Sequence, residues 1–173
     1  YTLTTDPYKG TDPWEQMAYV RVSSTDTNEN GDAPRSNIAA FRVGEPDGKL
    51  TRLSHPLAYN LSNEIDPAVL PDGRILYASW LRATLERGVK GRISLLGMNP
   101  DGTDPSLIAG DEGRRIKHMP CVTTDRLVVF VEGDSVGWDG AGSLACVSLR
   151  RNLHSYRRIT SEKDGLFHSP SAL

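Results

Sequence analysis

The stretch "NEIDPAVLPDGRILYASW", residues 63–80, places an Asp-Pro pair, a Pro-Asp-Gly turn and an apolar run in close succession. Pro71 fixes its own φ and Gly73 accepts a positive φ, so "PDGR" predicts a tight turn. The flanking segments lack the 3.6-residue period of a helix. This stretch therefore predicts two short antiparallel strands joined by a hairpin.

The same arrangement recurs along the chain. Four prolines stand at intervals of about 50 residues, namely Pro13, Pro67, Pro120 and Pro170. Each complete copy continues from its proline through an apolar strand, a polar loop containing glycine, a second strand and a short closing strand. "EPDGK" (45–49) and "NPDGTD" (99–104) predict turns before the closing strands. In the third copy "TTDR" replaces "PDGR", and we expect that turn to be one residue shorter.

Four antiparallel strands repeated at this period are typical of β-propeller blades. One such blade is too thin to bury both faces, so blades stack around an axis. We expect an all-β chain with each proline at the start of the innermost strand of its blade, near 12–16, 66–70 and 118–123. The predicted blades span about 12–55, 64–111 and 117–162, and a fourth starts at about 166–173.

Aromatic residues occupy equivalent places in these copies. Tyr77 and Phe130 have the same offset from the prolines of their repeats, and Tyr19 follows a shorter turn. We expect all three to pack between blades. Because three blades are about half a ring and leave apolar faces uncovered, we expect the remaining blades of a longer chain, or a second copy, to complete it.

The composition agrees with this architecture. The 173 residues include 16 glycines and 11 prolines, with 38% hydrophobic residues, which suits short strands and turns better than a helical bundle. The net charge is -2 with both signs interspersed, so nothing indicates a nucleic-acid partner. The longest apolar run, "LVVFV" at 127–131, is too short to span a bilayer.

Two family resemblances attach to these residues. "DPAVLPDGRILY", with "MNPDGT" and "LI" after it, resembles the TolB-like, WD40-like (PD40) propeller repeat, with Leu70 where serine is usual. "KHMPCVTTDRLVVFVE", "DSVGWDGAG" and "LFHSPSAL" look like the propeller of hydrazine synthase alpha-subunit-like proteins. That resemblance implies an extracytoplasmic, periplasmic or secreted, bacterial protein, with c-type haem in domains beside the propeller. This chain lacks the haem attachment motif, so we expect no cofactor within it.

Two histidines are candidate ligand-binding residues. His118 and His168 stand two residues before Pro120 and Pro170, so both imidazoles could face one mouth of the propeller channel. They could instead cap strand starts through backbone hydrogen bonds. Two histidines without a third partner make a poor metal site, and we predict none.

The cysteines and one loop aromatic complete the candidates. Cys121 and Cys146 are expected as separate thiols, because a whole strand, roughly 9–10 Å, lies between them. Cys121 could approach a cofactor held by another part of a longer protein. Trp138 lies at the tip of the loop "EGDSVGWDGAG" (132–142), where it could contact a partner or pack over a neighbouring blade. The arginine doublet at 150–151 is expected to be solvated rather than to bind phosphate.

The sequence contains no Walker loop, no G-x-S-x-G and no H-E-x-x-H, so we assign no catalytic residue. Three hypotheses remain open. The chain is a binding and scaffolding propeller segment of a larger secreted protein, or part of a c-type-haem redox subunit of the hydrazine-synthase kind. The third hypothesis, a propeller that gates a separate hydrolase domain, rests on fold analogy alone.

Overall fold

The computed structural model describes residues 3–5, 16–23, 36–43, 50–52, 63–81, 91–135 and 139–172. Side chains in the first four of these ranges are described only at 37–39. In the part of the chain covered by these ranges, every regular element is a strand or a short 3-10 turn, and no helix is long and apolar enough to cross a membrane.

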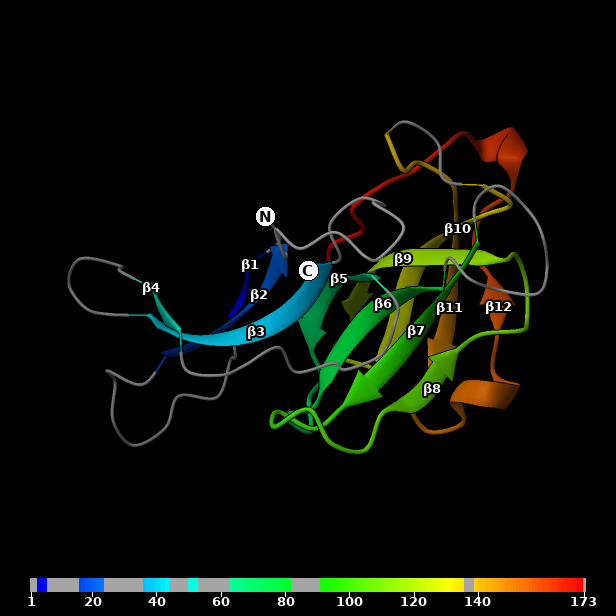
Figure 1. Ribbon diagram of the computed structural model, residues 1–173. Helices are drawn as coiled ribbons and strands as arrows, with labels where there is room; N and C mark the ends of the chain where they lie inside the picture. The colour runs from blue at the N-terminus through cyan, green and yellow to red at the C-terminus, as the bar shows by residue number, and fades with distance from the viewer. Residues whose placement is uncertain are drawn as a thin grey trace.

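The strands form three consecutive four-stranded antiparallel blades, shown in Figure 1. The first blade contains β1 (Leu3–Thr5), β2 (Gln16–Ser23), β3 (Ser36–Val43) and β4 (Leu50–Arg52). The second contains β5 (Asn63–Val69), β6 (Ile75–Leu81), β7 (Arg92–Met98) and β8 (Ser106–Ala109). The third contains β9 (Ile116–Val122), β10 (Leu127–Gly133), β11 (Ser143–Ser148) and β12 (Arg157–Arg158). The 3-10 turns η1 (Asn152–His154) and η2 (Glu162–Asp164) flank β12.

Within each blade the strands pair in chain order, as expected for propeller blades. The second and third blades also meet at one parallel pair, between Ile93 of β7 and Ile116 of β9. In the first blade the innermost position, next to β2, is taken by β1, which lies upstream of the stretch 12–16 where we expected the innermost strand. Of that stretch only Gln16 is among the described residues, and it begins β2.

Pro67 and Pro120 lie inside β5 and β9 rather than at the starts of these strands, which corrects the expectation. Pro13 lies outside the described residues, and Pro170 is not part of a strand. The pairing of β5 with β6 shifts register between Ile65 and Ala68, so Asp66 and Pro67 form a β-bulge. Met119 and Pro120 form the equivalent bulge in β9. A bulge leaves its extra residues out of the ladder, so proline's missing N–H costs no strand hydrogen bond there.

The hairpin between β5 and β6 and the hairpin between β9 and β10 have the same length, which corrects the prediction of a shorter turn in the third blade. Leu70 N–H donates to the Arg74 carbonyl at 2.8 Å, and Gly73 N–H donates to the Leu70 carbonyl at 2.9 Å. Residues 123–127 repeat both bonds, at 2.9 and 3.0 Å. In this alignment Arg126 takes the place of Gly73, and both have positive φ, 61° and 84°.

The aromatic residues of β6 and β10 are buried between blades, as predicted. Tyr77 packs with Ile38 of the first blade and with Ile75 and Met98 of its own. Phe130 is fully buried in the larger core cluster that the second and third blades share. The side chain of Tyr19 lies outside the described residues, so its packing stays a prediction. Stacking of blades face to face therefore buries the core.

Candidate ligand site on the propeller axis

An open cavity of about 240 Å³ lies where the inner strands of successive repeats come together. Three equivalent dipeptides line it: Asp66-Pro67, Met119-Pro120 and Ser169-Pro170. The last pair follows a short antiparallel bridge between Gly142 and Phe167, which brings the end of the chain alongside β9 and β11. We call this space the axial cavity, because the innermost strand of each blade faces the axis of a propeller.

The residue before each proline has a left-handed backbone. Asp66, Met119 and Ser169 have φ values of 52°, 49° and 47°. Residues with a side chain rarely adopt this conformation, and the proline that follows restricts the backbone further. Such strain persists only where the surroundings hold it, and it clusters at functional sites. Its repetition at three equivalent positions marks the axial cavity as a candidate site.

The side chains of Asp66 and Met119 each bond to the equivalent residue of the next repeat. Met119 N–H donates to Asp66 Oδ2 at 2.9 Å. One repeat further on, Ser169 N–H donates to Met119 Sδ at 3.4 Å. The thioether is a weak acceptor and the carboxylate a strong one, so the first link is the stronger. The links fix the spacing of neighbouring blades around the cavity.

His118 precedes Met119 of the cavity lining in the chain and is buried. Its Nδ1 is 3.9 Å from Asp66 Oδ2. Burial holds the pKa of His118 below its ordinary value, and the nearby Asp66 charge and a hydrogen bond with the backbone of Gly140 oppose that shift only in part. Gly140 has a φ of 72°, and a Cβ there would approach His118 Cε1 to 3.0 Å. The site thus presents a neutral imidazole next to a carboxylate at neutral pH.

His168 has a different environment from His118 although the two occupy equivalent places in the repeat. His168 is exposed, and its Nδ1 lies 3.2 Å from Ser169 Oγ at the rim of the cavity. Across the described ranges there is no group of three or more His, Cys, Asp or Glu residues that could hold a metal ion. Neither histidine lines the axial cavity: His118 is buried and precedes Met119 in the chain, whereas His168 is exposed and precedes Ser169.

The cysteines lie on either side of β10. Both Cys121 of β9 and Cys146 of β11 pair with Val129, so one strand separates the two thiols and neither forms a disulfide. This agrees with the expectation of two separate thiols. Burial raises the pKa of the Cys121 thiol, and a hydrogen bond with the backbone of Ala172 lowers it by less. Trp138 lies outside the described residues.

A second polar group is buried in the third blade and holds its last strand. Glu132 is fully buried and accepts hydrogen bonds from Tyr156 Oη at 2.7 Å and from Arg158 Nε at 2.9 Å. Its cross-strand partner Lys117 is also fully buried and donates to the carbonyls of Gly110, at 2.9 Å, and Arg114. Burial holds the pKa of Lys117 below its ordinary value. This network connects β12 to the blade core.

The sequence pointed to the histidines but not to the three residues that line the cavity together with the prolines. The available signal was their place immediately before each repeat proline. It was overlooked because Asp66, Met119 and Ser169 share no chemistry, and only their backbone geometry makes them equivalent.

The fold and the repeated axial geometry define a class: the chain is a segment of an all-β propeller built from four-stranded antiparallel blades. No family model matches the chain. In sequence it is similar to hydrazine synthase subunit alpha of Kuenenia stuttgartiensis, with 34% identity over 124 residues. That match covers 68% of this chain and 15% of the relative, so the chain corresponds to a small part of the relative's length.

Two solved propeller structures are similar to this chain. The structure of Kuenenia stuttgartiensis hydrazine synthase matches with a TM-score of 0.71 and 26% identity, over 91% of this chain and 23% of that chain. A thermostable family-43 glycoside hydrolase matches with a TM-score of 0.60 and 16% identity, over 93% of this chain and 54% of that chain. The second likeness shows the fold alone.

Proposed function

We propose that the chain is a binding and scaffolding segment of a β-propeller within a larger, secreted bacterial protein, and that its ligand or protein partner binds at the axial cavity. The observation that carries this proposal is the repeated left-handed residue before each proline, at Asp66, Met119 and Ser169. Strain retained at three equivalent positions around one cavity favours a role in binding. The side chains of Asp66 and Ser169 give this cavity its polar groups, and the buried His118 lies 3.9 Å from Asp66.

The scaffolding role concerns the outward face of the third blade. On this face the side chains point away from the core shared with the second blade. Three of them are only half-buried: Leu127, Val129 and Leu144. In a propeller this face packs against the next blade. The relative of known sequence is several times longer than this chain, which supports further blades of a longer chain as the covering element. A second copy of the chain is the other candidate.

Static light scattering on the isolated 173-residue chain tests the scaffolding role. We expect association into dimers or larger species, because an uncovered blade face and its edge strand promote pairing. A strictly monomeric 19.0 kDa species that unfolds cooperatively would show that this face needs no partner.

A second candidate function is part of a c-type-haem redox subunit, and the 34% identity to hydrazine synthase subunit alpha is the observation that favours it. In this hypothesis haem sits in neighbouring domains and the propeller positions them. The visible absorption spectrum of the intact protein that contains this segment separates the two hypotheses. A Soret band supports the redox subunit, whereas a spectrum without one supports a propeller with a binding role alone.

A further inference from the structure

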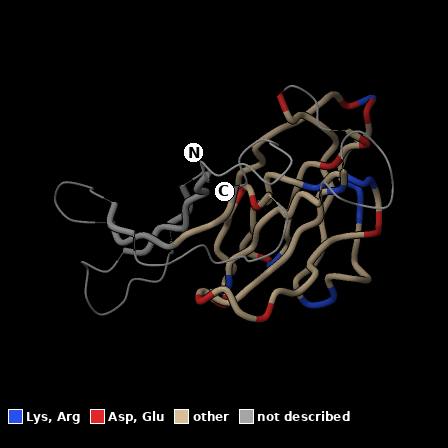
Figure 2. The backbone as a smooth tube through the Cα atoms, in the orientation of Figure 1, with Lys and Arg blue, Asp and Glu red and all other residues tan. Residues whose placement is uncertain are grey.

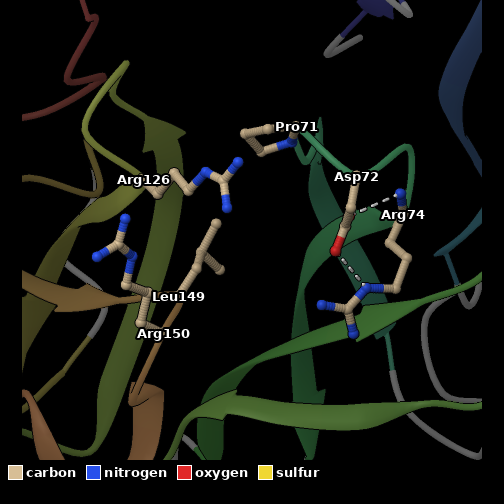
Figure 3. A pocket seen from close by; sticks show the side chains of 6 residues that line it. All are labelled: Pro71, Asp72, Arg74, Arg126, Leu149 and Arg150. Carbon is tan, nitrogen blue, oxygen red and sulfur yellow. Dashed lines mark hydrogen bonds and ion pairs between the residues drawn. The ribbon is translucent and has the colours of Figure 1, made fainter.

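A second cavity, of about 270 Å³, lies between the second and third blades and shares no residue with the axial cavity. We call it the arginine cleft. Its lining comes from the inner hairpin of the second blade, the inner hairpin of the third and the loop after β11, and consists of Pro71, Asp72, Arg74, Arg126, Leu149 and Arg150. Figure 3 shows Asp72 and Arg74 on one wall and Arg126 and Arg150 on the facing wall.

The charges in the arginine cleft do not balance. Arg74 Nε donates to Asp72 Oδ2 at 3.0 Å, so these two residues satisfy each other. Within the ranges that the structure describes, neither Arg126 nor Arg150 has a carboxylate partner. Three guanidinium groups against one carboxylate leave an excess of two positive charges. In Figure 2 the loop between β11 and η1, which contains Arg150, appears as a basic segment at the edge of this blade.

Arg126 occupies its place at a conformational cost. It takes the turn position that glycine fills in the second blade, with a φ of 61° against 84° at Gly73. Glycine adopts that region freely, whereas a side chain there is strained. The turn would form more easily with glycine, and among the described residues the Arg126 side chain gains no ion pair in return. In Figure 3 its guanidinium extends across the gap towards the hairpin of the second blade.

We infer that the arginine cleft binds a small dianion through its oxygen atoms. Guanidinium groups donate in a planar fork that matches carboxylate and phosphate oxygens, and two charges are needed to offset the excess. Asp72 orients Arg74 through its hydrogen bond, and Pro71 on one side and Leu149 on the other provide apolar surface for the rest of the ligand. Phosphate and dicarboxylates share this chemistry, and the experiment compares them.

Isothermal titration calorimetry of the 173-residue chain with inorganic phosphate and with succinate tests the inference. We expect saturable binding of at least one dianion with a Kd below about 1 mM at low ionic strength, weakening as sodium chloride is added. Tighter phosphate binding would identify a phosphoryl ligand, and tighter succinate binding a dicarboxylate. Failure of both to bind would overturn the inference.

Single substitutions distinguish binding in the arginine cleft from attraction of the anion to positive charge elsewhere on the surface. Arg126→Gly restores the residue that the turn prefers, so the fold is retained, and we expect it to weaken binding at least tenfold. Arg150→Gln should weaken binding by a similar factor. Arg151→Gln is the matched control, because Arg151 is exposed and does not line the cleft. Equal affinity in Arg126→Gly and the parent chain, or an equal loss in Arg151→Gln, would contradict the assignment.

Discussion

The second and third blades share strand order, hairpin length and bulge position, yet they differ in the side chains at equivalent places. Glu64 and Ser79 face each other across β5 and β6, where the third blade has Lys117 and Glu132. At the inner turn the second blade has Gly73 and the third has Arg126. Prolines, turns and apolar strands thus determine the backbone that the two blades share. The other positions can differ between the blades and can therefore have different functions.

The difference extends to how each blade holds its buried charge. In the second blade the Ser79 hydroxyl donates to Glu64 Oε1 at 3.3 Å. In the third blade Glu132 accepts hydrogen bonds from Tyr156 and Arg158, which lie in and just before the closing strand β12. The third blade therefore depends on its polar core for attachment of β12, and substitutions at equivalent places should have unequal effects.

The largest expected effect is at the shared core. Phe130→Ala removes a fully buried ring from the contact between the second and third blades and should cost about 3–5 kcal/mol in the free energy of unfolding. Urea denaturation measures it, with Leu166→Ala, at a residue 67% exposed, as the control. A loss of unfolding free energy below about 1 kcal/mol for Phe130→Ala would show that Phe130 is not part of a packed core between the two blades.

The next effect tests the buried network. Glu132→Ala removes the acceptor of Tyr156 and Arg158 and leaves Lys117 buried without its counter-charge, so we expect a loss of about 3 kcal/mol. Chemical denaturation compares it with Glu162→Ala, which breaks an exposed ion pair to Arg114 and should cost less than about 1 kcal/mol. An equal loss of unfolding free energy in the two variants would mean that the buried hydrogen bonds of Glu132 stabilise the fold no more than an ion pair at the surface.

The equivalent turns allow a reciprocal test. Gly73→Ala places a side chain at a φ of 84° and should lower the unfolding free energy by about 1 kcal/mol. Arg126→Gly relieves the same conformation and should leave stability unchanged or raise it by up to about 1 kcal/mol. Thermal unfolding of both variants provides the comparison. A clear destabilisation by Arg126→Gly would indicate that the arginine supports the fold.

Local features made most of the fold predictable. The prolines, the "PDGR" turn and the apolar runs depend on neighbours in sequence, so the blades and the burial of Tyr77 and Phe130 could be inferred. The bulges could not, because register depends on the partner strand. The axial cavity also could not, because its lining residues meet only when successive blades stack. Arg126 was missed at its turn because arginine gives no sequence signal for a positive φ.

The smallest expected effect is a pH dependence. His118 has a folded-state pKa below its ordinary value of 6.5, so the unfolded chain takes up a proton more readily. The stability contributed by neutral His118 is complete above pH 6.5 and is lost as the pH falls through the lower, folded-state pKa. His118→Gln should therefore flatten the decline in unfolding free energy between about pH 7 and pH 5. Identical pH profiles for the two chains would exclude this role.

The central claim is that equivalent residues before the repeat prolines converge on one axial cavity. In a background of Cys121→Ser and Cys146→Ser, a short thiol-specific cross-linker is applied to chains carrying Asp66→Cys with Met119→Cys, and to chains carrying Asp72→Cys with Met119→Cys. We expect an efficient cross-link within one chain for the first pair and little for the second, measured by mass spectrometry of the digested monomer. Equal cross-linking of both pairs, or none in the first, would contradict it.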